Sequence, residues 1–130
     1  MKRFIFMVIL AIVLVSASIL ECVFIKNTFD FLEDEVQKIE TLLAQNPEHI
    51  NTTENIKAIT DFHEKWHGKM TILKTLVWHT GIKEVEIELY RAQSYIEENN
   101  YTEAKVELQN LLSLAEHYEN DFKFSLENIF

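Results

Sequence analysis

An uncharged apolar run, FIFMVILAIVLVSASIL, occupies residues 4–20 and limits what the rest of the chain can do. As a helix this run rises about 25 Å, and its continuation past Glu21 to Ile25 brings the length to about 33 Å. That length is sufficient to cross the hydrocarbon core of a bilayer. The sequence therefore predicts a short stub and a transmembrane anchor in residues 1–25, inserted through residues 4–25, and one domain in residues 26–130.

A cleaved signal peptide is the alternative interpretation of the same run. Val15, Ser16 and Ala17 are small residues of the kind that a signal peptidase accepts. The run is nevertheless longer than the apolar core of an ordinary signal peptide, which spans about 7 to 15 residues, and this favours an anchor. Cys22 does not resemble a lipid-modified cysteine, because Glu21 stands where a small residue is expected.

The charges on either side of the run predict its direction in the membrane. Lys2 and Arg3 precede it, whereas acidic residues from Asp30 onward outnumber Lys26 on the other side. Positively charged flanks stay in the cytoplasm. We therefore expect a single-pass protein of the cell membrane whose N-terminus is cytoplasmic and whose C-terminal domain lies outside the cytoplasm.

The domain is strongly acidic. The whole chain has 12 basic and 21 acidic residues, a formal net charge of -9, and the anchor region contributes little to this excess. Such a surface repels phosphate backbones, so nucleic acid is excluded as a partner. Cys22 is the single cysteine, and the domain must therefore be held together by packing and not by an internal disulfide.

Apolar residues recur at steps of three and four along four segments of the domain, which is the period of amphipathic helices. The chain has only two glycines and one proline, so it offers few turns. We expect an all-α fold: an N-terminal transmembrane helix followed by a small antiparallel bundle of about four helices, the first continuous with the anchor. The expected core positions are Ile25, Phe29, Leu32, Val36, Ile39, Leu43, Ile56, Ile59, Trp66, Met70, Leu73, Val77, Ile82, Val85, Leu89, Ala92, Ile96, Ala104, Leu108, Leu111, Ala115, Tyr118 and Phe122.

Local signals place the ends of these helices. Pro47 disfavours helical geometry in the residue before it, so the first helix should end near Asn46. Asn51, with Glu54 three residues later, is predicted to cap a second helix that runs to about Trp78. The later boundaries are predicted at Thr80 and Gly81, which should break the chain, at the turn of Asn99 and Asn100, and at Thr102 as the cap of the fourth helix.

One motif carries a specific chemical hypothesis. His63, Glu64 and His67 match the H-E-x-x-H pattern of zinc peptidases, in which two histidines on one helix face hold zinc and the glutamate activates its water. Lys65 lies inside the motif, where zinc peptidases carry uncharged residues. No downstream pattern marks the third ligand, for which Glu84, Glu86, Glu88 and His79 are all candidates. We therefore expect no metal and no other cofactor, and we keep a zinc hydrolase as an alternative.

The last residues, FKFSLENIF, are unusually apolar for a chain end. Ile129 and Phe130 are therefore predicted to make an interaction, either by docking on the bundle or by binding another protein. We expect them to be buried against the bundle near the third helix or the turn after it.

The segment HTGIKEVEIELYRAQSYIEENNYTEAKVELQNLLSLAEHYENDFKFSLENIF resembles the uncharacterised family known as domain of unknown function 4363. The resemblance lies in the turn at His79, the acidic helix from Glu84 and the ending Ser125 to Phe130. It implies a small protein of spore-forming Gram-positive bacteria with an N-terminal hydrophobic helix and a helical body, and it implies no activity. Genes of this family lie beside that of a multi-pass membrane protein, which is the partner that the resemblance implies.

These observations favour a non-enzymatic, membrane-anchored interaction module that binds another envelope or membrane protein through an acidic helical face or through its apolar tail. Two alternatives remain open. The zinc hydrolase requires bound metal at His63 and His67, with Glu64 as the base. A sensor of small extracytoplasmic ligands requires an apolar pocket between helices.

Overall fold

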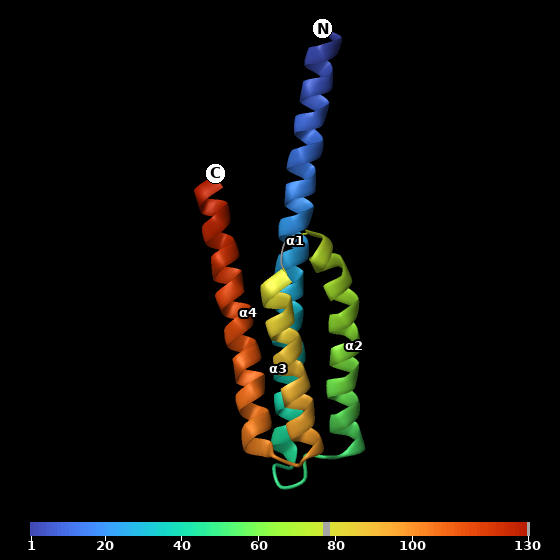
Figure 1. The fold of residues 1–130 in the computed structure, drawn as a ribbon, viewed down its shortest axis with the longest axis vertical. Coiled ribbons are helices and arrows are strands. Elements are labelled where there is room, and N and C mark those ends of the chain that lie inside the picture. The colour runs from blue at the N-terminus through green and yellow to red at the C-terminus, as the bar shows by residue number, and fades with distance from the viewer. Residues whose placement is uncertain (77–78, 130) are drawn as a thin grey trace.

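The fold was analysed in a computed structural model, which describes the backbone of residues 1–76 and 79–129 and the side chains of residues 1–74, 81–123 and 127. These residues form four helices, α1 (Lys2–Gln45), α2 (Thr53–Leu76), α3 (His79–Glu97) and α4 (Tyr101–Ile129). The expected all-α fold is confirmed, and α1 passes without a break from the apolar run into the bundle (Figure 1).

The four helices stand antiparallel, and each packs against two others. α1 contacts α2 and α4, and α3 contacts the same two helices, so that α1 faces α3 diagonally. Figure 1 shows α1 projecting far beyond one end of this arrangement. The bundle therefore has two unlike ends, one where α1 leaves it and one formed by the α1–α2 and α3–α4 connections.

The core confirms the apolar periodicity. From Ile25 onward one stripe of α1 is buried, and nearly all of the other expected positions with described side chains lie in the same cluster. Phe29, Ile56 and Phe122 are partly buried at its edge. The sequence pattern overlooked Ile50 and Phe62, both of which are fully buried. Val77 lies outside the described residues.

α1 changes character along its length. Residues 1–20 are exposed, and the first buried side chain is that of Ile25. By length and composition, α1 is long and apolar enough to cross a membrane, and it is the one helix of this kind among the described residues. A signal sequence near the start of a chain would meet the same test.

Three predicted helix boundaries were wrong by one or two residues. α2 is capped by Thr52 and not by Asn51, because the Thr52 hydroxyl accepts a hydrogen bond from the Asn55 backbone N–H at 3.2 Å. α4 is capped by Asn100 and not by Thr102, because the Asn100 side chain accepts from the Glu103 N–H at 3.2 Å. Thr and Asn side chains cap equally well in either place, and the surrounding loop decides which one is used.

The third error concerns Thr80 and Gly81, which do not break the chain. Both lie inside α3, which begins at His79, and Gly81 is buried. Glycine in a helix costs about 1 kcal/mol relative to alanine, but it needs no space for a side chain in a crowded interior.

Two parts of the chain lie outside the described residues. They are residues 77–78, which connect α2 to α3, and the end of the chain, where the side chain of Ile129 and the whole of Phe130 are not described. The burial of Ile129 and Phe130 against the bundle therefore stays a prediction.

The connections at the other end are tied together by one residue. Asn99 has a positive φ of 56°, a left-handed conformation that asparagine tolerates better than most residues. Its side-chain oxygen accepts a hydrogen bond from the Ile50 N–H at 2.7 Å, and its amide donates to the Glu48 carbonyl at 2.8 Å. Asn55 donates to the Ile50 carbonyl at 2.9 Å. The α3–α4 turn thus fixes the α1–α2 connection.

We predict that Asn99→Ala lowers the free energy of unfolding by about 3 kcal/mol, because it removes two interhelical hydrogen bonds and places a Cβ without a polar group in the left-handed region. Asn99→Gly should cost less, about 1 to 2 kcal/mol, since glycine accepts the positive φ. Chemical unfolding of the full chain in detergent measures both. Equal losses in the two variants would show that backbone strain is irrelevant at this turn.

Candidate functional site

The H-E-x-x-H motif lies on α2, on the side that packs against α3. The His63 ring stacks on the Tyr90 ring with centroids 4.2 Å apart, and His63 Nδ1 lies 3.1 Å from Gln93 Oε1. His67 is largely exposed, and its Nδ1 lies 3.9 Å from Glu86 Oε1. Glu64 is exposed. Both histidines therefore contact α3, and each has a different partner there.

The candidate third ligands are distributed over two interfaces. Glu86 is the one that lies near a motif histidine. Glu84 accepts a hydrogen bond from the Tyr118 hydroxyl of α4, and Glu88 faces α4 as well. Among the described residues, no three histidine, cysteine, aspartate or glutamate side chains are grouped so as to hold a metal ion. The side chain of His79 lies outside the described residues. The geometry therefore gives the two histidines interhelical contacts and no shared third ligand.

We predict that His63→Ala lowers the stability of the full chain by about 1 kcal/mol, because it removes the contacts with Tyr90 and Gln93. His67→Ala should change it by less than about 0.5 kcal/mol, since that side chain is exposed. Thermal unfolding in detergent with and without added zinc provides the measurement. A zinc-dependent rise in Tm that disappears in both variants would support the hydrolase alternative.

The interface between α3 and α4 contains a pair of acids that sequence reasoning did not identify. Glu107 is only 8 % exposed although it carries a carboxyl group. It faces Glu88, and burial, together with a hydrogen bond to Glu107 and repulsion from it, raises the pKa of Glu88 to about 7. Arg91 Nη1 lies 3.2 Å from Glu88 Oε1, and Asn110 donates to Glu107 Oε2 at 3.2 Å. Glu88 therefore keeps its proton up to near neutral pH.

A signal for this pair exists in the sequence. Glu107 lies three residues after Ala104 and four before Leu111, which are core positions of the same helix. Glu88 follows Val85 at the same spacing. An acidic residue in register with an apolar stripe is expected to be buried and paired.

Tyr118 is a further polar residue of α4 that faces α3. Burial, the hydrogen bond to Glu84 and the charge of that carboxylate raise the pKa of its phenol.

The raised pKa of Glu88 predicts a pH dependence of stability. An unfolded glutamate titrates near pH 4.5, so between this value and about 7 the folded chain binds more protons than the unfolded chain. Stability should therefore fall as pH rises through that window, by about 1 to 3 kcal/mol from this pair. Glu107→Gln should reduce the fall and make the chain more stable than the parent at pH 8.

Chemical unfolding of the full chain at several pH values between 4.5 and 8 tests this prediction. Glu116→Gln is the matched control, because Glu116 is an exposed glutamate on the same helix. If Glu107→Gln and Glu116→Gln keep the slope of the parent, the carboxyl pair does not govern the pH dependence.

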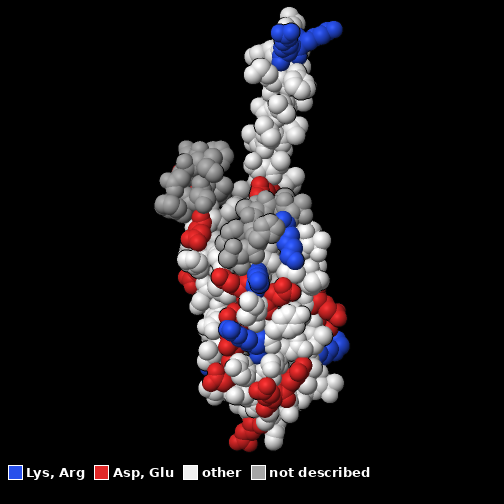
Figure 2. Space-filling model, in the orientation of Figure 1, with Lys and Arg blue, Asp and Glu red and all other residues white. Residues whose placement is uncertain are grey.

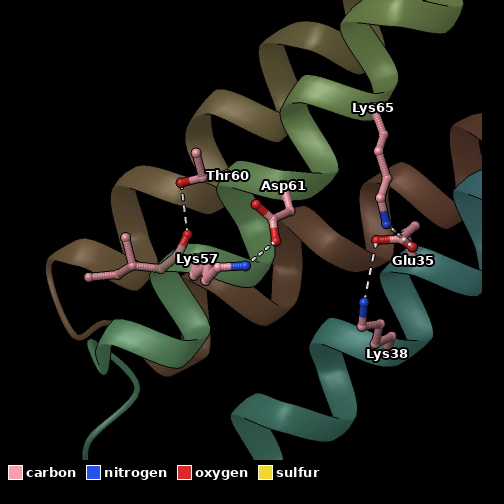
Figure 3. Close-up of polar contacts among 7 residues, drawn as sticks. Glu35, Lys38, Lys57, Thr60, Asp61 and Lys65 are labelled. Carbon is pink, nitrogen blue, oxygen red and sulfur yellow. Dashed lines mark hydrogen bonds and ion pairs between the residues drawn. The ribbon is translucent and has the colours of Figure 1, made fainter.

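The α1–α2 side carries an open groove with charged side chains along it. Lys65 Nζ donates a hydrogen bond to Glu35 Oε1 at 3.2 Å, and Lys57 Nζ donates to Asp61 at 2.9 Å (Figure 3). Lys38 also lies 4.0 Å from Glu35. The groove is lined by Lys38, Thr41, Leu42, Glu54, Lys57, Ala58 and Asp61. Four charged side chains share this lining with Leu42 and Ala58.

The net negative charge is unevenly divided between the two ends of the bundle. The contacts of Lys65 with Glu35 and of His67 with Glu86 divide the bundle into two parts. The distal half, residues 35–65 and 85–116, lies on the side away from the exposed part of α1. Its 63 residues include 13 acidic and five basic ones, whereas the 42 residues of the proximal half, residues 26–34, 66–84 and 117–130, include seven acidic and five basic ones. Figure 2 shows the projection of α1, which is uncharged apart from the basic residues at its tip, and the charged surface of the bundle below it.

Comparison with known proteins gives a family and no activity. A family described as a domain of unknown function (DUF4363) matches residues 20–129. Searches of curated proteins and of solved structures found no match. The matched region begins in the apolar part of α1 and includes the whole bundle, so the expected resemblance extends over most of the chain. The chain therefore belongs to the family of the domain of unknown function DUF4363.

Proposed function

We propose that this chain is a membrane-tethered, non-enzymatic interaction module that presents its acidic distal half to a partner protein outside the cytoplasm. The observation that carries the proposal is the continuity of α1, which is one helix from its exposed apolar part to the distal end of the bundle. If residues 4–25 span the membrane, the twenty residues from Lys26 to Gln45 hold the distal connections about 30 Å from the bilayer.

The proposed orientation of the chain across the membrane follows from the charges on either side of its apolar run. Lys2 and Arg3 keep the start of α1 in the cytoplasm, and the acidic bundle follows on the outer side. A stiff helix without a flexible linker would fix both the height and the orientation of the acidic surface. This arrangement suits recognition of a second protein in the same membrane. It is consistent with the partner that the family resemblance implies, a multi-pass membrane protein of spore-forming Gram-positive bacteria.

The chemistry of the surface indicates what kind of partner fits. The distal half has a net charge of -8, counted from its 13 acidic and five basic residues. Charge complementarity then favours a partner with a basic surface and makes association sensitive to salt. The contacts of His63 with Tyr90 and Gln93 give that histidine a packing role between α2 and α3, which is consistent with a module held together by its helices.

A membrane-impermeant amine cross-linker applied to intact protoplasts should join this chain to one discrete membrane protein. Replacing Glu97 and Glu98 by lysine should reduce the product at least about tenfold, because it reverses charge at the distal end. Lysines are tolerated there, since they lie at the C-terminal end of α3, where positive charge suits the helix dipole.

The matched control reverses Asp30 and Asp34, which are exposed on α1 in the proximal half. This variant should cross-link like the parent. A product that forms only after the protoplasts are opened would show that the topology is wrong. Equal loss in both variants would show that the distal surface has no special role.

A further inference from the structure

α4 extends farther toward the membrane-proximal side than α2 and α3. Gln109 donates to Glu40 across the α1–α4 interface, and the pKa of Lys123 is raised by Glu119 first and also by Asp30 and Glu33 of α1. The hydrogen bond between Gln109 and Glu40 sets an antiparallel register. Twenty residues beyond Gln109 bring α4 to Ile129, and twenty residues before Glu40 lead to Leu20.

α2 and α3 stop earlier. Lys69 lies over the Phe31 ring at 4.8 Å, and Lys65 pairs with Glu35, so α2 runs antiparallel to α1 with its last residue, Leu76, level with about Phe24. α3 begins at His79, next to that end. In Figure 1 the last turns of α4 lie above the ends of α2 and α3, beside the exposed part of α1, and lean away from it.

The depth reached by α4 coincides with the place where α1 leaves the bundle. Leu20 is 70 % exposed, Val23 is 51 % exposed and Ile25 is 6 % exposed. The span proposed above ends at Ile25. The last two turns of α4, residues 123–129, therefore lie at the level of the outer end of the span.

The sequence of these turns suits that level. From Phe122 the chain reads FKFSLENI, in which Phe122, Leu126 and Ile129 recur at the four- and three-residue steps of one helix face, with Lys123, Ser125, Glu127 and Asn128 between them. Short helical segments that combine aromatic or aliphatic residues with a few charges favour the boundary between headgroups and acyl chains. Transfer of large apolar side chains from water to that boundary contributes favourably to the binding of a helix end to the bilayer.

We propose that the last two turns of α4 insert into the outer interface of the bilayer beside the anchor, as a second lipid contact in place of the docking on the bundle that the sequence predicted. This inference rests on the proposed membrane span. With one contact through α1 and another through α4, the bundle cannot tilt freely about the anchor, and its acidic distal half is held away from the membrane surface.

The test uses the full chain with Cys22→Ser, which removes the single native thiol. Ser125→Cys places an environment-sensitive NBD label in the last turns of α4, and Ser113→Cys places the same label at an exposed position earlier on the same helix. Both proteins are reconstituted into vesicles of phosphatidylcholine and phosphatidylglycerol, with and without doxyl-labelled lipid. Flotation of the vesicles measures anchoring independently of the label.

The label at position 125 should emit at shorter wavelength than the label at 113 and lose at least half of its emission to doxyl lipid, while the label at 113 should resemble a label in water. Equal access of aqueous dithionite to both labels in floating vesicles would overturn the insertion and leave the anchor intact. A blue shift at 125 without lipid quenching would also overturn it, in favour of a protein partner or a second copy. Failure to float would overturn the anchor and this inference together.

Discussion

Every other feature of this structure depends on the fact that α1 is a single helix with two environments. Its first part is apolar and exposed, and its second part supplies one side of the bundle core from Ile25 onward. The hydrophobic effect favours removing both parts from water, but the bundle covers only the second part, through side chains of the neighbouring helices α2 and α4. The helix therefore defines the axis of the bundle and distinguishes its two ends.

The two ends are chemically unlike because different interactions close them. At the distal end, Asn99 uses backbone geometry and two hydrogen bonds to lock one connection onto another, within a surface rich in acidic residues. Toward the other end the bundle is more nearly neutral, and α4 continues past α2 and α3. The tether proposed above would use this asymmetry to present one defined end of the bundle to a partner.

Buried acids between α3 and α4 give the bundle a property that packing alone would not provide. Glu88 and Glu107 meet in one interface, where the pKa of Glu88 is raised, Arg91 contacts Glu88 and Asn110 donates to Glu107. The cost of burying a second negative charge links the association of these two helices to pH. Contacts with Tyr118 and Glu107 of α4 direct Glu84 and Glu88 away from the histidines of α2.

The sequence alone determined the helical class, the number of helices, the apolar span and most of the core, because periodicity and charge act locally along the chain. It placed Asn51, Thr102 and the break at Thr80 and Gly81 wrongly, since several neighbouring residues could serve at each boundary and the packing of loops selects among them. The short connections already indicated that sequential helices are neighbours, but that His63 meets Tyr90 and that Glu88 meets Glu107 was decided by the tertiary structure alone. Contacts between distant segments depend on how helix faces rotate against one another, and a helical repeat does not encode that rotation.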